Sequence, residues 1–303
     1  MKAAIIPNLT RTRARDISLK LISALDRAGI GALMSERMRT AFPGVNCKFV
    51  PEETLYASAD IVMPVGGDGS VIRAGKRAAA CGKRILGVNA GNLAYLCGLD
   101  PEDLDLLPKL AAGEYSIQRR LLLSAEFYRD GILTGTELCL NDIVFCRGET
   151  IGMVDISVQA DEKPIADYIA DGVIFSTPTG STAYSMAAGG PIMEPTLDAV
   201  LLTSICPHSL AFRPYIFGAD TVFTVRGRER TEGADVRWSC DGERTVTLQE
   251  NETVKIRRAS VHAEFISLKT DNFIDILNKK TLKCGSTTAF FMCTLVGLAK
   301  SLM

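Results

Sequence analysis

The stretch VMPVGGDGSVIRAG, residues 62–75, decides the fold class of this chain. The apolar run at 61–65 predicts a buried strand, Gly66–Ser70 a glycine loop, and Val71–Cys81 a helix that ends at Gly82. Glycines allow a ligand to approach the backbone closely and permit positive φ angles, and the N–H groups at a helix start favour phosphate oxygens. The loop lacks the GxxxxGK pattern of a Walker A loop and is only half of a dinucleotide-binding GxGxxG.

Asp68 is the unusual residue of this loop. A carboxylate repels phosphate, so Asp68 needs another role, and a proton acceptor or a ligand to a magnesium ion would fit. The alternative is a plain turn in which Asp68 caps the helix, because Asp and Gly are ordinary turn residues. The loop alone leaves both readings open.

The first third of the chain repeats the strand–helix pattern. We predict strands at 3–6 and 85–88, and helices at 16–28 and at 101–110, the last closed by Gly113. Such repetition favours an α/β domain with a Rossmann-like parallel sheet and helices on its faces.

The pattern changes near Arg119. Short runs with two-residue alternation predict a β-rich domain of antiparallel strands over residues 120–268. The runs lie at 121–128, 138–145, 154–160, 221–226, 236–240, 245–248, 254–258 and 263–268. We therefore predict an α/β domain at 1–119, completed by about 269–303, with a helix at 271–282 and no clear period in 284–303.

A second polar stretch, DGVIFSTPTGSTAYSMAAGGPIMEP, covers residues 171–195. An apolar run leads into a block of hydroxyls, glycines and prolines, and then into a helix-forming string. Strand, polar loop and helix start are how a chain presents N–H and O–H donors to a polar ligand.

Composition excludes several classes of protein. A formal charge of −1 argues against a nucleic-acid binder, and 47% hydrophobic residues argue against a disordered chain. The nine cysteines form no CxxC pair and there are only two histidines, so no zinc site is predicted. Scattered cysteines fit a reduced, cytoplasmic protein, and the late apolar segment 289–299 is too short to span a membrane.

GGDGS is similar to the GGDGT loop of NAD kinases, of diacylglycerol-type lipid kinases and, more remotely, of 6-phosphofructokinases. Four further segments, in the right order, resemble the NAD kinase family specifically. They are NAGNLAYL (89–96), LNDIVF (140–145), the start of the 171–195 stretch, and ICPHSLAFRP (205–214). The resemblance implies an α/β domain plus a β-sandwich-like second domain. It also implies transfer of the terminal phosphate of ATP to the 2′-hydroxyl of the adenosine ribose of NAD, giving NADP and ADP.

The resemblance also implies roles for single residues. Asp68 matches the family's general base, Asn141 and Asp142 the pair that holds ribose hydroxyls, and Asp171 an aspartate near the nicotinamide. Without the resemblance, Asn141–Asp142 also fits a turn or strand end, and Tyr184 also fits a packing residue. The implied substrate- and nucleotide-binding residues are Gly66, Gly67, Gly69, Ser70, Asn89, Asn141, Asp142, Asp171, Thr182, Ala183, Tyr184 and Ala187.

The chain departs from the family pattern at several positions. Ser70 replaces a threonine, Ala94 and Tyr95 stand where Gly-Phe is usual, and Glu243 stands where glutamine is common. Ile169 occupies a position that is polar or basic in several relatives, which puts the substrate contacts there in doubt.

The resemblance further implies Mg²⁺ or another divalent metal with ATP, although no metal ligand is assigned. The expected partners are NAD, ATP and further copies of the chain, as a dimer or tetramer, without nucleic acid or membrane. Two alternatives remain: a lipid kinase of the diacylglycerol or sphingosine class, which shares the glycine loop, and a non-catalytic nucleotide-binding module. Asp68 counts against the second.

Overall fold

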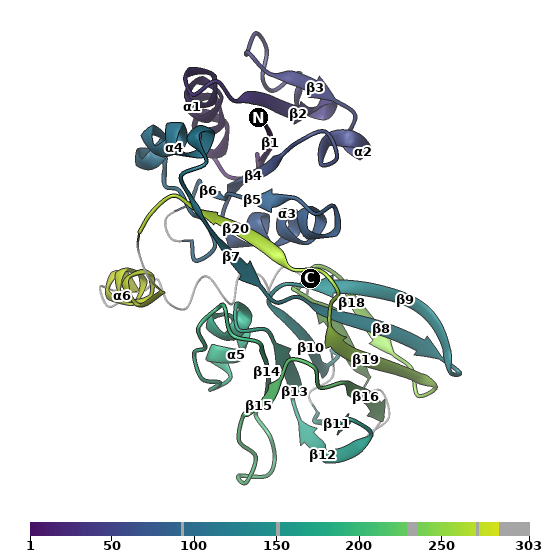
Figure 1. Cartoon of the computed structure of the whole chain (residues 1–303). Coiled ribbons are helices and arrows are strands. Elements are labelled where there is room, and N and C mark those ends of the chain that lie inside the picture. The colour runs from purple at the N-terminus through teal and green to yellow at the C-terminus, as the bar shows by residue number, and fades with distance from the viewer. Residues whose placement is uncertain (92–93, 150–151, 229–234, 271–272, 285–303) are drawn as a thin grey trace. The chain divides into compact units, whose positions relative to one another are not determined.

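A computed structural model describes residues 1–91, 94–149, 152–228, 235–270 and 273–284. The chain forms two compact units, the first comprising Met1–Arg119 with Val261–Lys283, and the second comprising Arg120–Ser260 (Figure 1). The expectation for the tail at 285–303 falls outside the described residues. No described helix is long and apolar enough to cross a bilayer.

The first unit is built on a sheet of eight strands in the order β3-β2-β1-β4-β5-β20-β7, with β6 paired to β4. All pairings from β3 through to β20 are parallel, as the alternation of strands and helices predicts. The strands are β1 (Lys2–Pro7), β2 (Gly31–Ser35), β3 (Lys48–Val50), β4 (Ile61–Gly66), β5 (Arg84–Ile85), β6 (Val88–Asn89), β7 (Ser116–Arg120) and β20 (Ala263–Ser267).

Helices α1 and α3 pack against this sheet. Ile61, Met63 and Val65 of β4 share a core with α1, whereas Val62 points to the opposite face, where α3 packs on β4. The helices are α1 (Ala14–Arg27), α2 (Glu52–Leu55), α3 (Asp68–Ala80), α4 (Leu107–Ala112) and α6 (Phe273–Cys284). Gly113 follows α4 with φ +78°, the left-handed end that its position predicts.

Strand β20 lies where the sequence pattern did not place it. We expected residues 263–268 among the antiparallel strands of the β-rich domain, but Phe265 pairs in parallel with Ile85 of β5. That expectation is wrong, because two-residue alternation identifies a strand without identifying the sheet that it joins.

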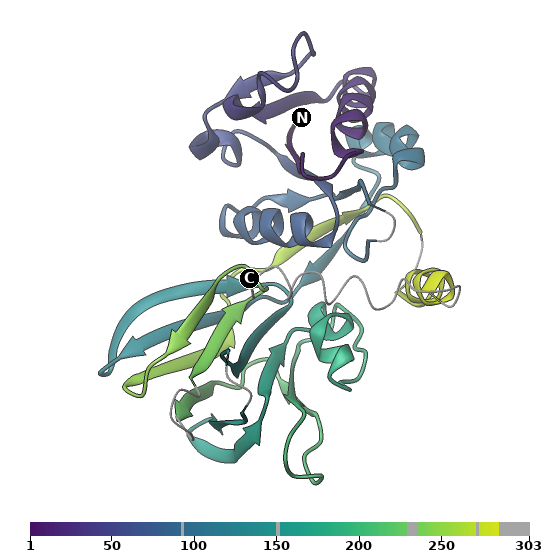
Figure 2. The same ribbon diagram turned by 180° about the vertical axis from the view of Figure 1, so that it is seen from behind.

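The second unit contains two antiparallel sheets of six strands, ordered β15-β14-β13-β10-β17-β18 and β12-β11-β16-β19-β8-β9. Inward side chains of both sheets form one core, as in a β-sandwich. Figure 2 shows its long, curved hairpin of β8 and β9. The strands are β8 (Leu123–Arg129), β9 (Ile132–Cys139), β10 (Asp142–Arg147), β11 (Val154–Ala160), β12 (Lys163–Ala170), β13 (Gly172–Ser176), β14 (Ala199–Ile205), β15 (Tyr215–Gly218), β16 (Phe223–Arg228), β17 (Val236–Cys240), β18 (Thr245–Leu248) and β19 (Glu252–Arg258).

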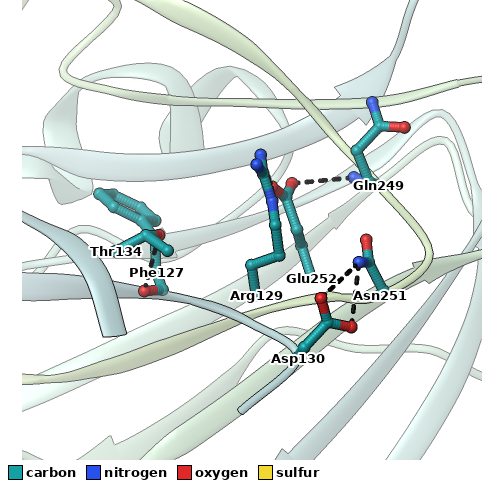
Figure 3. A network of polar contacts seen from close by, with 7 residues as sticks. All are labelled: Phe127, Arg129, Asp130, Thr134, Gln249, Asn251 and Glu252. Atoms are coloured by element: carbon teal, nitrogen blue, oxygen red, sulfur yellow. Dashed lines mark hydrogen bonds and ion pairs between the residues drawn. The ribbon is translucent and has the colours of Figure 1, made fainter. Parts of the chain in front are cut away.

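A polar network ties this hairpin to β19 (Figure 3). Arg129 pairs with Glu252, whose other carboxylate oxygen accepts the N–H of Gln249 at 3.0 Å. Next to it, the amide of Asn251 donates to both carboxylate oxygens of Asp130 at 3.1 Å. These bonds fix the turn between β8 and β9 and the start of β19.

The run at 138–145, predicted as one strand, is broken in two. β9 ends at Cys139, the chain turns at Leu140 and Asn141, and β10 begins at Asp142. The turn-forming residue types Asn141 and Asp142 are the local sign of the break. Its cause lies about a hundred residues further along the chain, in Asp241.

Candidate functional site

The glycine loop of the first unit joins the fully buried β4 to α3. A Cβ atom on Gly66 would overlap the hydroxyl oxygen of Ser70, so the glycine permits Ser70 to pack beneath the loop. The positive φ angles expected here are absent at Gly66, Gly67 and Gly69. The glycines therefore serve close approach rather than a left-handed backbone.

Asp68 begins α3 but does not cap it with its side chain. Its Oδ2 accepts the backbone N–H of Tyr95 at 2.9 Å, and its Oδ1 accepts that of Leu96 at 2.8 Å. The carboxylate is thus oriented by the segment that follows β6, where this chain has Ala94–Tyr95 instead of Gly-Phe. The helix-cap alternative does not describe Asp68.

Ser70, the last residue of the loop, and Asn89, next to the loop, form hydrogen bonds within the unit. Ser70 Oγ accepts from the amide of Asn8 at 2.9 Å. Asn89, which is buried, donates to Asp100 at 2.9 Å and accepts from Gly91 N–H at 2.8 Å. The backbone of Ala90 donates to the carbonyl of Gly66, which joins the turn to the glycine loop. The side chain of Asn89 is therefore engaged in holding this turn.

Sequence reasoning missed two arginines that flank the glycine loop. The guanidinium of Arg11, after β1, lies 3.9 Å from the position of a Cβ on Gly67, and that of Arg73, in α3, lies 4.0 Å from the same point on Gly69. Both side chains belong to exposed residues. Guanidinium groups suit phosphate oxygens. The basic run TRTRAR at 10–15, two residues after the first strand, was the available signal.

In the second unit, Asp142 and Tyr184 are joined by a hydrogen bond. Asp142 is 7% exposed, and its carboxylate accepts the backbone N–H of Tyr184. Burial, with a smaller contribution from the charge of Asp241, raises the pKa of Asp142 to about 7. Burial also raises the pKa of the Tyr184 hydroxyl. A carboxyl group that titrates near neutral pH in a recessed position is typical of functional sites.

Asn141 lies beside Asp142, and its side-chain amide is not fully hydrogen-bonded. Its side-chain oxygen is buried and has no hydrogen-bond partner among the described residues. Its backbone is closely packed, because a Cβ atom on Gly180 would lie 2.6 Å from Asn141 Cα and overlap the Asn141 carbonyl. Buried polar atoms are almost always paired, so this oxygen is available to a donor beyond the described residues.

The 171–195 stretch reaches this pair through Tyr184, but its helix has a different form from the one expected. The helix is short: Gly180–Thr182 is a 3₁₀ turn and α5 covers only Tyr184–Ala187. The N–H of Tyr184, at the start of α5, is used by Asp142 and is not available to a ligand. Thr182, at the end of the 3₁₀ turn, donates to the carbonyl of Thr179 at 3.4 Å. The predicted residues Ala183 and Ala187 lie before α5 and at its end.

Asp171 precedes β13 and forms an ion pair with Arg147 at 3.3 Å. Its charge and that of Asp142 both act on the hydroxyl of Tyr184. Asp171, Asp142 and Tyr184 therefore belong to one neighbourhood of the unit.

A cavity of about 180 Å³ lies elsewhere in this unit, and none of the predicted site residues lines it. Its lining includes the stacked rings of Phe127 and Trp238, with centroids 4.2 Å apart.

Comparison with known proteins identifies the family. Residues 4–115 match the model of the ATP-NAD kinase N-terminal domain, and residues 140–268 match that of the ATP-NAD kinase C-terminal domain. The chain is 35% identical to an NAD kinase of Symbiobacterium thermophilum over 92% of its own length and 98% of the relative's. The chain belongs to the NAD kinase family. A second NAD kinase, from Moorella thermoacetica, is 35% identical over 94% of this chain and 90% of that relative.

Solved structures agree on the fold of this NAD kinase family member. Yeast NADH kinase complexed with NADH superimposes with a TM-score of 0.84 at 21% identity, covering 96% of this chain and 89% of that one. An NAD kinase from Archaeoglobus fulgidus in complex with ATP gives 0.70 at 23% identity, covering 92% and 96%. The expected NAD kinase fold, with its α/β and β-sandwich-like parts, is confirmed. The lipid-kinase alternative receives no support from these comparisons.

Proposed function

We propose that this protein transfers the terminal phosphate of ATP to the 2′-hydroxyl of the adenosine ribose of NAD, producing NADP and ADP. The observation that carries the proposal is the pair Asn141–Asp142. A buried amide oxygen without a protein partner lies beside a buried carboxyl group, at the positions where the family holds ribose hydroxyls. The name of the relatives and the ATP bound to the Archaeoglobus enzyme support the substrate and the donor.

In the proposed reaction Asp68 is the general base. Its carboxylate takes the proton of the 2′-hydroxyl while the hydroxyl oxygen forms a bond to the terminal phosphorus of ATP. The bond between that phosphorus and the oxygen bridging to the β-phosphate breaks, and ADP leaves. The backbone N–H groups of Tyr95 and Leu96 hold the carboxylate in one orientation, which favours proton transfer.

Binding is assigned to the other predicted residues. We assign the glycine loop, with Gly69 and Ser70, to the phosphates, and Thr182 to Ala187 to the adenosine. In this scheme Tyr184 contacts the nucleoside with its ring while its backbone N–H stays on Asp142. Asp171 is assigned to the nicotinamide end of NAD.

A divalent metal, Mg²⁺ by expectation, would be bound chiefly through ATP. Among the described residues there is no group of three or more His, Cys, Asp or Glu side chains that could hold a metal ion. Magnesium commonly keeps its waters and binds substrate phosphates with one or two carboxylates, which this donor set allows. When bound, the metal neutralises charge on the transferring phosphate.

The test measures NADP formation from NAD, ATP and magnesium by the purified protein. Asp68→Asn should lower kcat by about 100-fold or more, as loss of a general base does, with the Kd for NAD changed only a few-fold. Asp16→Asn is the control, because Asp16 is also an acidic residue in the first turn of a helix of the same unit. No NADP from the wild type with any donor, or phosphorylation of a diacylglycerol instead, would refute the proposal.

We further propose that the protein works in the cytoplasm as a homo-oligomer, dimer or tetramer. The free cysteines among the described residues fit a reducing compartment, and the oligomer follows from the family resemblance. Sedimentation velocity tests the oligomer: a single monomeric species at micromolar concentration contradicts it.

A further inference from the structure

Asp241 lies in the turn between β17 and β18, with φ +53°. Its carboxylate accepts the backbone N–H groups of Leu140, Asn141 and Asp142, at 3.0, 2.7 and 3.3 Å. It also accepts the buried thiol of Cys139 at 3.1 Å. Four donors from four successive residues therefore converge on one side chain.

These bonds determine the path of the chain at Asn141–Asp142. Three successive N–H groups that point at one carboxylate cannot remain in a strand ladder, where they would alternate in direction. β9 therefore ends, the chain turns, and β10 begins at Asp142. The N–H of Asp241 in return donates to the carbonyl of Asp142 at 2.9 Å. The dipeptide therefore donates hydrogen bonds to Asp241, and Asp241 donates one back to the dipeptide.

The side chains of the dipeptide are left for other partners. The carboxylate of Asp241 accepts the backbone N–H groups of Asn141 and Asp142. The amide oxygen of Asn141 has no partner among the described residues. The carboxyl group of Asp142 receives the N–H of Tyr184. On the far side of the backbone, Gly180 fits closely against Asn141.

We propose that Asp241 is the positioning residue of the acceptor site: it makes no contact with substrate, but presents Asn141 and Asp142 to the ribose hydroxyls of NAD. The inference rests on the proposed function for the identity of the ligand. Asp241 belongs to the CDGE segment (240–243), in which Glu243 stands where relatives often have glutamine.

The test is Asp241→Asn. Asparagine tolerates positive φ, so the turn keeps its backbone, but its amide nitrogen faces N–H donors and loses acceptor capacity. We expect the Kd for NAD, measured by calorimetric titration of NAD alone, to rise at least tenfold. The KM for ATP should change less than twofold, and kcat at saturating NAD less than threefold.

Asp161→Asn is the matched control. Asp161 also has positive φ, +47°, and its carboxylate accepts one backbone N–H, that of Val222 at 3.0 Å, in a hairpin away from Asn141. The control should bind NAD like the wild type. An Asp241→Asn protein with unchanged NAD affinity, or with equal losses for NAD and ATP, would overturn the inference. Failure of the proposed function is a separate result, because it appears in the wild type as lack of NADP formation.

A pH profile supplies a readout that a purely structural role would not move. Asp142 faces the charge of Asp241, the thiol of Cys139 and the hydroxyl of Tyr184, each from a different element. Removal of the Asp241 charge lowers the pKa of Asp142, so the midpoint of NAD affinity against pH should move to lower pH in Asp241→Asn. An unmoved midpoint would contradict the inferred coupling.

Discussion

Gly180→Ala tests the close approach between the 3₁₀ turn and Asn141. The added Cβ atom would lie 2.6 Å from Asn141 Cα and overlap the carbonyl of the same residue. Carbon atoms in contact are about 3.5–4.0 Å apart, so one backbone segment must move by about 1 Å. The φ of Gly180 is not in the left-handed region, so the effect is purely steric.

The magnitude follows from this geometry. Overpacking typically costs about 1–3 kcal/mol, and the upper half of that range applies because both partners are backbone rather than flexible side chains. For a protein of this size, about 2–3 kcal/mol lowers the unfolding temperature by roughly 4–12 °C. Because the displaced residue is Asn141, a shift of about 1 Å should also weaken NAD binding by one to two orders of magnitude.

The assay combines scanning calorimetry with NAD titration. Gly218→Ala is the control, since Gly218 lies in a strand of the same unit and no atom lies within 4 Å of its Cβ position. That control should stay within about 0.5 kcal/mol of the wild type. If Gly180→Ala and Gly218→Ala have the same unfolding temperature and the same NAD affinity, Gly180 does not lie against the backbone of Asn141.

Two further predictions concern charge. Burial raises the pKa of Asp142 to about 7, against about 3.9 in an unfolded chain, so between these values the folded state holds a proton that the unfolded state has lost, and stability falls as pH rises. Asp142→Asn should flatten the decline of unfolding temperature between about pH 4 and 7 in calorimetry, and an unchanged slope contradicts the assignment. Replacement of both Arg11 and Arg73 by Gln should raise the KM for ATP about tenfold and reduce its dependence on salt, with the KM for NAD unchanged. Arg27→Gln, on the exposed end of α1, is the control, and an unaffected KM for ATP removes the two arginines from the donor site.

Local pattern predicts local structure well in this chain. The strands predicted at 154–160, 236–240 and 245–248 are observed with those bounds, because alternate residues of each strand face the core of the sandwich. The parallel sheet was likewise predictable from strand–helix repetition. Both signals depend on residues a few positions apart, where the period of side-chain direction is fixed by the backbone.

The features that were missed depend on residues far apart in sequence. Phe265 joins Ile85 across 180 positions, and the break at Leu140–Asn141 depends on Asp241, about a hundred residues later. No periodicity in the run 138–145 encodes that break. Periodicity placed Asn141 and Asp142 inside one continuous strand. The family motif identified the same two residues as candidate site residues, so at this position the motif was more informative than the periodicity.

Asp68 can accept backbone N–H groups and still act as the proposed base. An ionised carboxylate has roughly four lone-pair sites, so it can accept two backbone N–H groups and a substrate hydroxyl together. The bonds from Tyr95 and Leu96 restrict rotation of the carboxylate, which a base needs if it is to meet the hydroxyl in one orientation. The departure from Gly-Phe at Ala94–Tyr95 leaves this arrangement intact, because the donors are backbone groups that any residue supplies. The glycine loop and the segment after Asn89 are therefore joined through the Asp68 carboxylate, and in the proposed mechanism this segment orients the base.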